Sequence, residues 1–177
     1  MPQRNRRTPP SPETILDRAL SFALEGLQAA DLQLQRARQE APQAPGGAFL
    51  WWIDLQFFIV ALRRLRRAAE LARRVPDQCP AVQKAIQEFD DAVPDLLLLR
   101  DVGEHIEDYA AEMGRNSSVS WRTLQAGSWD GITFDWLGTK LNADVAMEAA
   151  RKLVGEIEWA RQRTLYPERF GNQTNPQ

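Results

Sequence analysis

The single histidine of the chain, His105, follows Arg100 by five positions in the segment Arg-Asp-Val-Gly-Glu-His. An imidazole titrates near neutral pH, so it can both accept and donate a proton under physiological conditions. A guanidinium carries a permanent charge and binds a phosphate through paired hydrogen bonds. This pair could therefore bind a phosphate and transfer a proton beside it, chemistry that needs no cofactor.

The counts of histidine and cysteine exclude several other kinds of site. One histidine excludes two-histidine metal sites and di-iron bundles with two Glu-x-x-His repeats within one chain. The lone Cys79 forms neither an internal disulfide nor a Cys-x-x-Cys site. Because residues 77–80, Asp-Gln-Cys-Pro, are typical of a turn, a nucleophilic Cys79 with His105 as its base has little support. We predict no metal ion and no cofactor.

Length and composition predict one globular domain in the cytoplasm. The chain has 177 residues, of which 44% are hydrophobic and 26% charged, and its net charge of −2 gives no general attraction to nucleic acid. One cysteine and no secretory signal indicate a reducing compartment. The longest apolar run, residues 49–62, is too short to span a membrane. The domain is expected over residues 11–166, between disordered tails at residues 1–10 and 167–177.

Prolines, capping residues and apolar repeats predict an all-α fold, an antiparallel bundle of about five helices. The order Ser-Pro-Glu at residues 11–13 is typical of a helix start, and Asn142 is the expected cap of the last helix. Pro94 predicts a break, because proline removes a backbone donor and disfavours helical geometry in the residue before it. The predicted helices span residues 12–40, 49–74, 80–92, 95–113 and 143–163.

Beyond Gly114 the apolar period changes, which predicts a small β-hairpin inserted before the last helix. Its strands are expected at residues 118–125 and 132–137, joined across a loop at residues 127–131. A two-stranded element cannot bury three indoles by itself, so its tryptophans are expected to pack on the bundle or on a partner. These tryptophans are Trp121, Trp129 and Trp136.

The spacing within the predicted fourth helix suggests how its polar residues cooperate. Asp101 and His105 are four positions apart, so the carboxylate is expected to hold and polarise the imidazole. Arg100 lies roughly 140° from His105 around an ideal helix, so a shared site needs an irregular turn or a second copy of the helix. Gly103 costs about 1 kcal/mol relative to alanine and predicts close approach of another helix. Together with the apolar second helix, it predicts a homodimer.

The string Arg100-Asp101-x-x-x-His105, on a late helix of an all-α bundle, resembles the HEPN superfamily, whose signature is R-x(4–6)-H, commonly with a polar residue after the arginine. The resemblance implies a metal-independent endoribonuclease of a toxin–antitoxin or phage-defence type, acting as a dimer, with RNA as substrate and an antitoxin as a further partner. Arg100 would stabilise the phosphate, His105 would transfer the proton, and Asp101 would match the polar helper. Gly103 and the inserted hairpin depart from the pattern.

The same residues also fit a protein without catalysis. Arg100 and Glu104 have the spacing of a solvated ion pair, and His105 fits a half-buried histidine bonded to Asp101. The chain would then be an interaction or regulatory module, or an inactive HEPN relative. Arg100 and His105 pointing into one cleft would favour the enzyme, whereas Arg100 paired with Glu104 on open surface would favour the module.

The densest positive cluster follows the apolar run. Arg63, Arg66 and Arg67 are candidates to track an RNA backbone, although such a run equally fits a solvated helix face in which Glu70 pairs with its neighbours. The preceding aromatic residues have helical spacing and are expected in the core or an oligomer interface rather than stacked on bases. These residues are Trp51, Trp52, Phe57 and Phe58.

Two further interpretations concern ligands. A closed aromatic pocket near Trp51 and Phe58 would indicate small-molecule binding in the bundle. An acidic set on the fourth predicted helix fits a solubilising face better than a cation site. Its members are Glu104, Glu107, Asp108 and Glu112.

Overall fold

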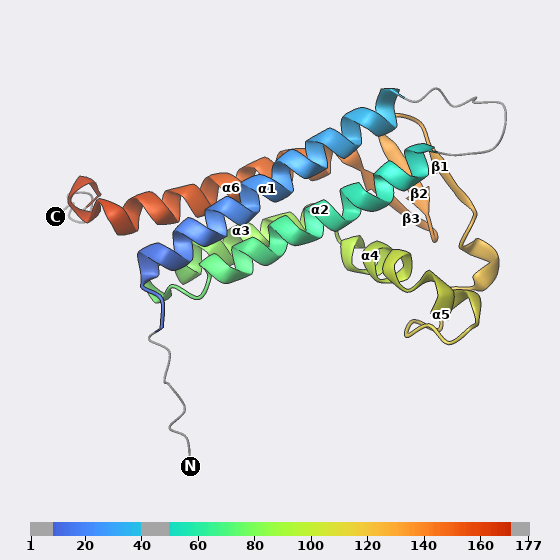
Figure 1. Ribbon diagram of the computed structural model, residues 1–177, viewed down its shortest axis with the longest axis horizontal. Coiled ribbons are helices and arrows are strands. Elements are labelled where there is room, and N and C mark those ends of the chain that lie inside the picture. The colour runs from blue at the N-terminus through green and yellow to red at the C-terminus, as the bar shows by residue number, and fades with distance from the viewer. Residues whose placement is uncertain (1–8, 40–49, 171–177) are drawn as a thin grey trace, which may run out of the picture.

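The computed structural model describes residues 9–39 and 50–170, and the account below concerns these residues. Four longer helices lie side by side, and two short helices and a small sheet lie toward one end of them (Figure 1). This arrangement confirms a mostly helical bundle with a small antiparallel sheet before the last helix. The helices are α1 (Pro12–Gln39), α2 (Leu50–Ala72), α3 (Cys79–Ala92), α4 (Leu96–Glu104), α5 (Ile106–Ala110) and α6 (Ala143–Leu165).

Local signals place the ends of the long helices. The Ser11 hydroxyl accepts a hydrogen bond of 3.3 Å from the Thr14 amide at the start of α1. Asn142 caps α6 by accepting a bond of 3.0 Å from the Val145 amide. The break expected at Pro94 lies between α3 and α4. The bounds of α1, α2, α3 and α6 agree with those predicted to within two residues.

Small residues bring α1 and α2 into close contact. A Cβ atom added to Gly26 on α1 would lie 3.0 Å from the Cβ of Leu65 on α2, a spacing tighter than ordinary side-chain packing. The buried alanines of this pair include Ala19, Ala23 and Ala30 on α1 and Ala61, Ala68 and Ala69 on α2.

The fourth helix predicted over residues 95–113 is not continuous. It breaks at His105, whose φ of −125° and ψ of 35° lie outside the helical region, and this break separates α4 from α5. Across this break the Tyr109 hydroxyl donates a hydrogen bond of 3.1 Å to the Asp101 carboxylate, which ties α5 to α4.

The inserted element is a three-stranded antiparallel sheet in the order β1-β2-β3, and its strands are β1 (Gly127–Trp129), β2 (Thr133–Trp136) and β3 (Thr139–Asn142). The strand predicted at residues 118–125 was wrong, because Trp121–Thr123 forms a short 3-10 turn capped by Ser120. The first three residues of the loop predicted at residues 127–131 form β1 instead. The turn lies at Asp130, whose carboxylate accepts bonds of 2.8 and 2.6 Å from the amides of Ile132 and Thr133.

Two of the three tryptophans attach the sheet to its surroundings. The fully buried Trp136 donates its indole N–H to the Leu124 carbonyl at 3.0 Å, and Trp129 donates to the Ala37 carbonyl on α1 at 3.2 Å. The indole of Trp52 on α2 packs edge to face against Trp136, with ring centroids 5.1 Å apart. The expected packing of the tryptophans on the bundle is confirmed for Trp129 and Trp136, whereas Trp121 is exposed.

The start of α2 is less buried than its composition predicts. Phe58 is fully buried, as expected, and Trp51 and Trp52 are half-buried. Phe57 differs, because 57% of its side chain is exposed. The helix thus keeps one apolar stripe in the core and carries a second one on its outer side.

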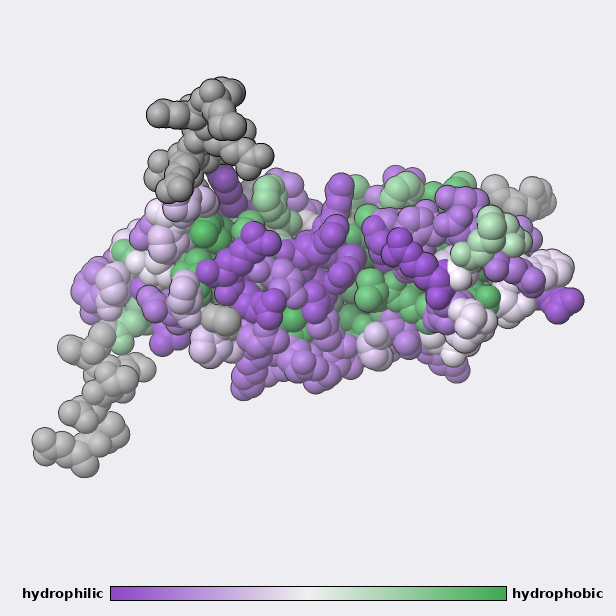
Figure 2. Space-filling view, turned by 90° about the horizontal axis from the view of Figure 1, so that it is seen from below, coloured by the Kyte–Doolittle hydropathy of each residue, from purple (hydrophilic) through white to green (hydrophobic). Residues whose placement is uncertain are grey.

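The ends of the described chain also differ from the prediction. Residues 1–8 and 171–177 of the expected tails lie outside the described residues, as does the helix-stopping segment at residues 41–47. Pro167–Arg169 forms a 3-10 turn, and Phe170 packs edge to face on Trp159 with ring centroids 5.0 Å apart. None of the described helices has the length and apolar character to cross a membrane. Seen from below, the surface is mainly hydrophilic, with hydrophobic patches between the polar side chains (Figure 2).

Candidate functional site

Arg100 is held by its own helix. Its guanidinium forms an ion pair with the Glu104 carboxylate one turn later, and a second, longer contact of 3.9 Å with Asp101. The side chain of Arg100 is 26% exposed and that of Glu104 is 36% exposed, so the pair lies at the surface. This is the arrangement expected of a structural ion pair, and it occupies the guanidinium that would clamp a phosphate.

Asp101 is hydrogen-bonded to Tyr109 and not to His105. Its carboxylate accepts the bond from the buried Tyr109 hydroxyl, which in turn accepts a bond of 3.3 Å from the Asn116 amide. Burial is the largest cause of a raised pKa of Tyr109, and its bond to Asp101 acts in the same direction. The expected hold of the carboxylate on the imidazole is therefore absent among the described residues, because the carboxylate has turned toward Tyr109.

His105 lies at the break between α4 and α5. Its backbone amide donates to the Asp101 carbonyl at 3.1 Å, which continues the helical pattern for one more residue. Its imidazole is half-buried and, within residues 9–39 and 50–170, makes no hydrogen bond or ion pair. No described side chain fixes the ring in the orientation that proton transfer requires.

Gly103 provides the close approach that the sequence suggested, but within one chain. A Cβ atom at this position would lie 2.2 Å from Oε1 of Gln56 on α2 and 4.0 Å from the indole of Trp136. The glycine thus lets α4 pack on α2 and the sheet. Its presence needs no second copy of the protein, and the homodimer stays a prediction.

The three arginines predicted to bind RNA, Arg63, Arg66 and Arg67, differ in their burial and in their ion-pair partners. Arg66 binds Asp90 of α3 through two bonds of 2.5 and 2.6 Å and Glu70 at 2.9 Å, and the bonds to Asp90 are the largest cause of its raised pKa. Arg63 is half-buried, and loss of hydration is the main cause of its lowered pKa, with smaller effects from neighbouring arginines that include Arg100. Arg67 is exposed on the outer side of α2. Arg66 is thus held by carboxylates and Arg67 is not, while the charges of both act on Arg63.

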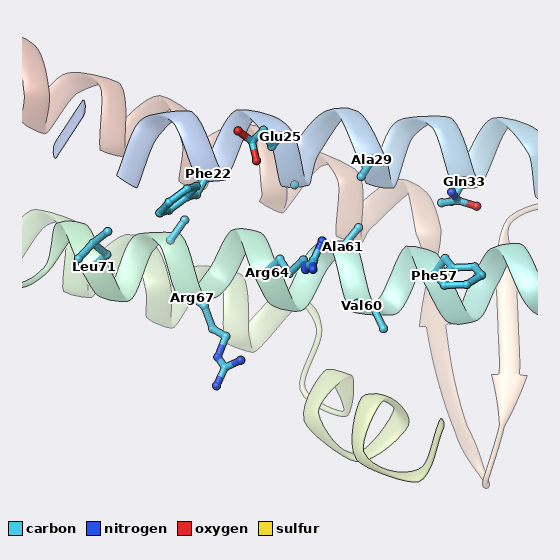
Figure 3. A pocket seen from close by; sticks show the side chains of 12 residues that line it. Phe22, Glu25, Ala29, Gln33, Phe57, Val60, Ala61, Arg64, Arg67 and Leu71 are labelled. Atoms are coloured by element: carbon cyan, nitrogen blue, oxygen red, sulfur yellow. The ribbon is translucent and has the colours of Figure 1, made fainter. Parts of the chain in front are cut away.

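A groove lies between α1 and α2 on the described surface. It has a volume of about 590 Å³, and Figure 3 shows Phe22 and Gln33 pointing from α1 into the space between the two helices. On α2, lining residues recur at positions 57, 60, 64, 67 and 71, which are three or four residues apart as on one face of a helix. Two large side chains of this groove are more than half exposed, Phe22 at 51% and Phe57 at 57%.

Sequence reasoning missed this groove, although one signal was present. The α2 residues at the groove follow a helical stripe of their own, offset from the stripe that enters the core. The first half of α2 is apolar on two sides, and only one of those sides is covered by another described element. The α2 residues lining the groove are Phe57, Val60, Ala61, Arg64, Arg67, Ala68 and Leu71.

Two remaining interpretations find no support in the described part of the chain. No three or more acidic, histidine or cysteine side chains there are grouped as a metal site would require. The aromatic side chains near Trp51 pack against each other, with Trp52 and Phe134 at a centroid distance of 5.5 Å.

Comparisons of the chain with protein-family models, curated proteins and solved structures find no match.

Proposed function

We propose that the protein is a non-catalytic interaction module that binds an α-helix of another protein in the groove between α1 and α2. One observation carries the proposal: an open groove with apolar walls, in which Phe22 and Phe57 remain more than half exposed. Exposed apolar surface of this kind is typical of a site that a partner covers. A two-helix groove accepts a third helix through apolar residues spaced at i, i+3, i+4 and i+7.

The dimensions of the groove suit a short helix. Residues 57 and 71 on α2 are fourteen positions apart, which corresponds to about 21 Å at ~1.5 Å per residue. A partner helix of about four turns matches that length. Of the small residues that line the groove, Gly26 and Ala61 are buried, and Ala29 is exposed on α1, where the backbone of a partner can approach closely.

A labelled synthetic helix tests the proposal. The probe is an 18-residue amphipathic peptide with leucines at i, i+3, i+4 and i+7 and glutamine on its remaining faces, titrated with the full chain by fluorescence anisotropy. We expect Phe57→Ala to weaken binding about tenfold or more, because a central aromatic side chain dominates such interfaces. Leu32→Ala is the matched control, since Leu32 on α1 is 53% exposed and lies outside the groove lining. Equal binding by both variants and the wild type contradicts the proposal.

A HEPN-like endoribonuclease is the second candidate, and one observation favours it. Burial is the main cause of the lowered pKa of Arg63 and the charge of Arg100 is a smaller one, so Arg63 lies within electrostatic reach of Arg100 on α4, the helix that ends just before His105. Activity would require Arg100 to leave Glu104, and the dimer, RNA and antitoxin partners would follow from the family resemblance. The endoribonuclease stays a candidate because Arg100 and His105 are both present, although Arg100 is paired with Glu104 and makes no hydrogen bond with His105.

The two candidates predict different outcomes in one experiment. Wild-type and His105→Ala proteins are expressed, and growth arrest and RNA degradation are scored. An RNase would degrade RNA in EDTA and leave 2′,3′-cyclic phosphate ends, and Arg100→Ala and His105→Ala would each abolish cleavage without additive effects. The interaction module predicts no RNA cleavage by any of the three proteins.

A further inference from the structure

The walls of the groove carry more positive than negative charge. Arg64 and Arg67 line its α2 side, and neither forms an ion pair with any residue that the structure describes. Glu25 on α1 is the single carboxylate of the lining, and it accepts a bond of 3.5 Å from Ser21. In Figure 3, Arg67 extends from α2 on the side away from α1.

The neighbouring carboxylates are already occupied. Asp90 binds Arg66, and Glu70 binds both Arg66 and Arg73. Glu25 on α1 is therefore the one carboxylate of the lining that can offset Arg64 or Arg67, which leaves one of the two guanidiniums uncompensated when a partner covers the groove. Covering a guanidinium without a partner charge carries a large desolvation penalty. A ligand that closes this groove must bring its own carboxylates.

A second copy of the chain would supply too few carboxylates to compensate these arginines. Two grooves facing each other would bring together four arginines and two glutamates, since each groove holds Arg64, Arg67 and Glu25. Two guanidiniums would stay uncompensated. An RNA backbone would match the arginines but leave the aliphatic walls, which include Val60 and Leu71, without apolar contact. An acidic amphipathic helix satisfies both the walls and the charges.

We propose that the occupant of the groove is an acidic amphipathic helix, whose apolar stripe lies between α1 and α2 and whose carboxylates line the flank that faces α2. This inference rests on the proposed function. Arg64 and Arg67 select the partner by charge, whereas Phe22 and Phe57 supply the apolar contact. The role is one of specificity, because charges at the rim of an interface discriminate between partners more than they add affinity.

Three peptides with one apolar stripe separate the two roles. They share their leucines and carry glutamate, glutamine or lysine on the flanks, and each is titrated with the full chain by fluorescence anisotropy. We expect the glutamate peptide to bind about tenfold tighter than the glutamine peptide at low salt, and the difference to shrink as salt is raised. In the double variant Arg64→Glu/Arg67→Glu the order should reverse, with the lysine peptide binding best.

The control carries the same change in net charge elsewhere. Arg18→Glu/Arg163→Glu replaces two exposed arginines that do not line the groove, and it should keep the wild-type order of the three peptides. Circular dichroism of each variant checks that the helices are intact. A reversal in the control as well would show that net charge alone decides, and would overturn the inference.

The remaining outcomes distinguish the inference from the function on which it rests. Equal binding of the three peptides, lost in Phe57→Ala, keeps the helix-binding function and overturns the acidic partner. If none of the three peptides binds, both the helix-binding function and the acidic partner are overturned. A dimer in light scattering that Phe57→Ala dissociates identifies a second copy as the occupant. Binding of a 15-nucleotide RNA that is lost in Arg64→Glu/Arg67→Glu but kept in Phe57→Ala identifies a nucleic-acid surface, and also overturns the inference.

Discussion

Tyr109 and Asp101 are joined by a hydrogen bond of 3.1 Å although eight positions separate them in the sequence. The bond ties α5 to α4, and it takes up the carboxylate that the spacing assigned to His105. Gly114 leaves room for the phenol, because a Cβ atom there would clash with the ring of Tyr109. The buried phenol thus competes with His105 for Asp101.

Tyr109→Phe should lower the free energy of unfolding by about 1 kcal/mol, because it removes the donor to Asp101 and the acceptor of the Asn116 amide. Urea unfolding followed by circular dichroism measures the change. Tyr166→Phe is the control, since Tyr166 is exposed and its hydroxyl makes no hydrogen bond with a described residue. A Tyr109→Phe protein as stable as the control would contradict the structural role of the bond.

Stability above pH 10 should depend on Tyr109. Burial, followed by the bond to Asp101, raises the pKa of this phenol above that of an unfolded tyrosine, which loses its proton near pH ~10. Above that pH the unfolded chain releases the proton while the folded protein retains it, so the free energy of unfolding falls as pH rises. Unfolding curves between pH 8 and about pH 11 should therefore decline more steeply for the wild type than for Tyr109→Phe. Parallel curves would argue against a buried phenol.

Gly26→Ala should destabilise the protein by about 1–3 kcal/mol, because the new Cβ meets both the side chain and the backbone of Leu65, which cannot move aside easily. Gly155→Ala on α6 is the matched change, since nothing lies within 4 Å of its added Cβ. It should stabilise the helix by about 1 kcal/mol. Thermal and urea unfolding of the two variants should move in opposite directions from the wild type, and a shift in the same direction would refute the close packing of α1 on α2.

Arg66→Gln and Arg67→Gln should differ in stability although the residues are adjacent. The first removes a guanidinium bound by Asp90 and Glu70 and should cost about 1–2 kcal/mol. The second removes an exposed guanidinium without an ion pair among the described residues and should stay within about 0.5 kcal/mol of the wild type. Equal losses in urea unfolding would contradict the division between a structural arginine and a binding arginine.

The positions of the long helices could be predicted because their signals act on neighbouring residues. Ser11, Pro94 and Asn142 change which backbone groups find a partner within one turn, and this effect does not depend on the rest of the fold. The sheet was predicted less well. Its turn at Asp130 depends on a short local pattern, but its third strand exists only because β2 provides a neighbour with which to pair.

By itself, the amino-acid sequence determined the helical fold, the ends of its main helices and the small set of residues with usable chemistry. Only the tertiary structure decided the partners of those residues. The side chains of Arg100, Asp101 and Arg66 each had several charged or polar neighbours within reach, and a fixed arrangement of helices selects among them. The groove is decided in the same way, because an apolar stripe is core or surface according to whether another element covers it, and Phe57 lies where none of the described elements does.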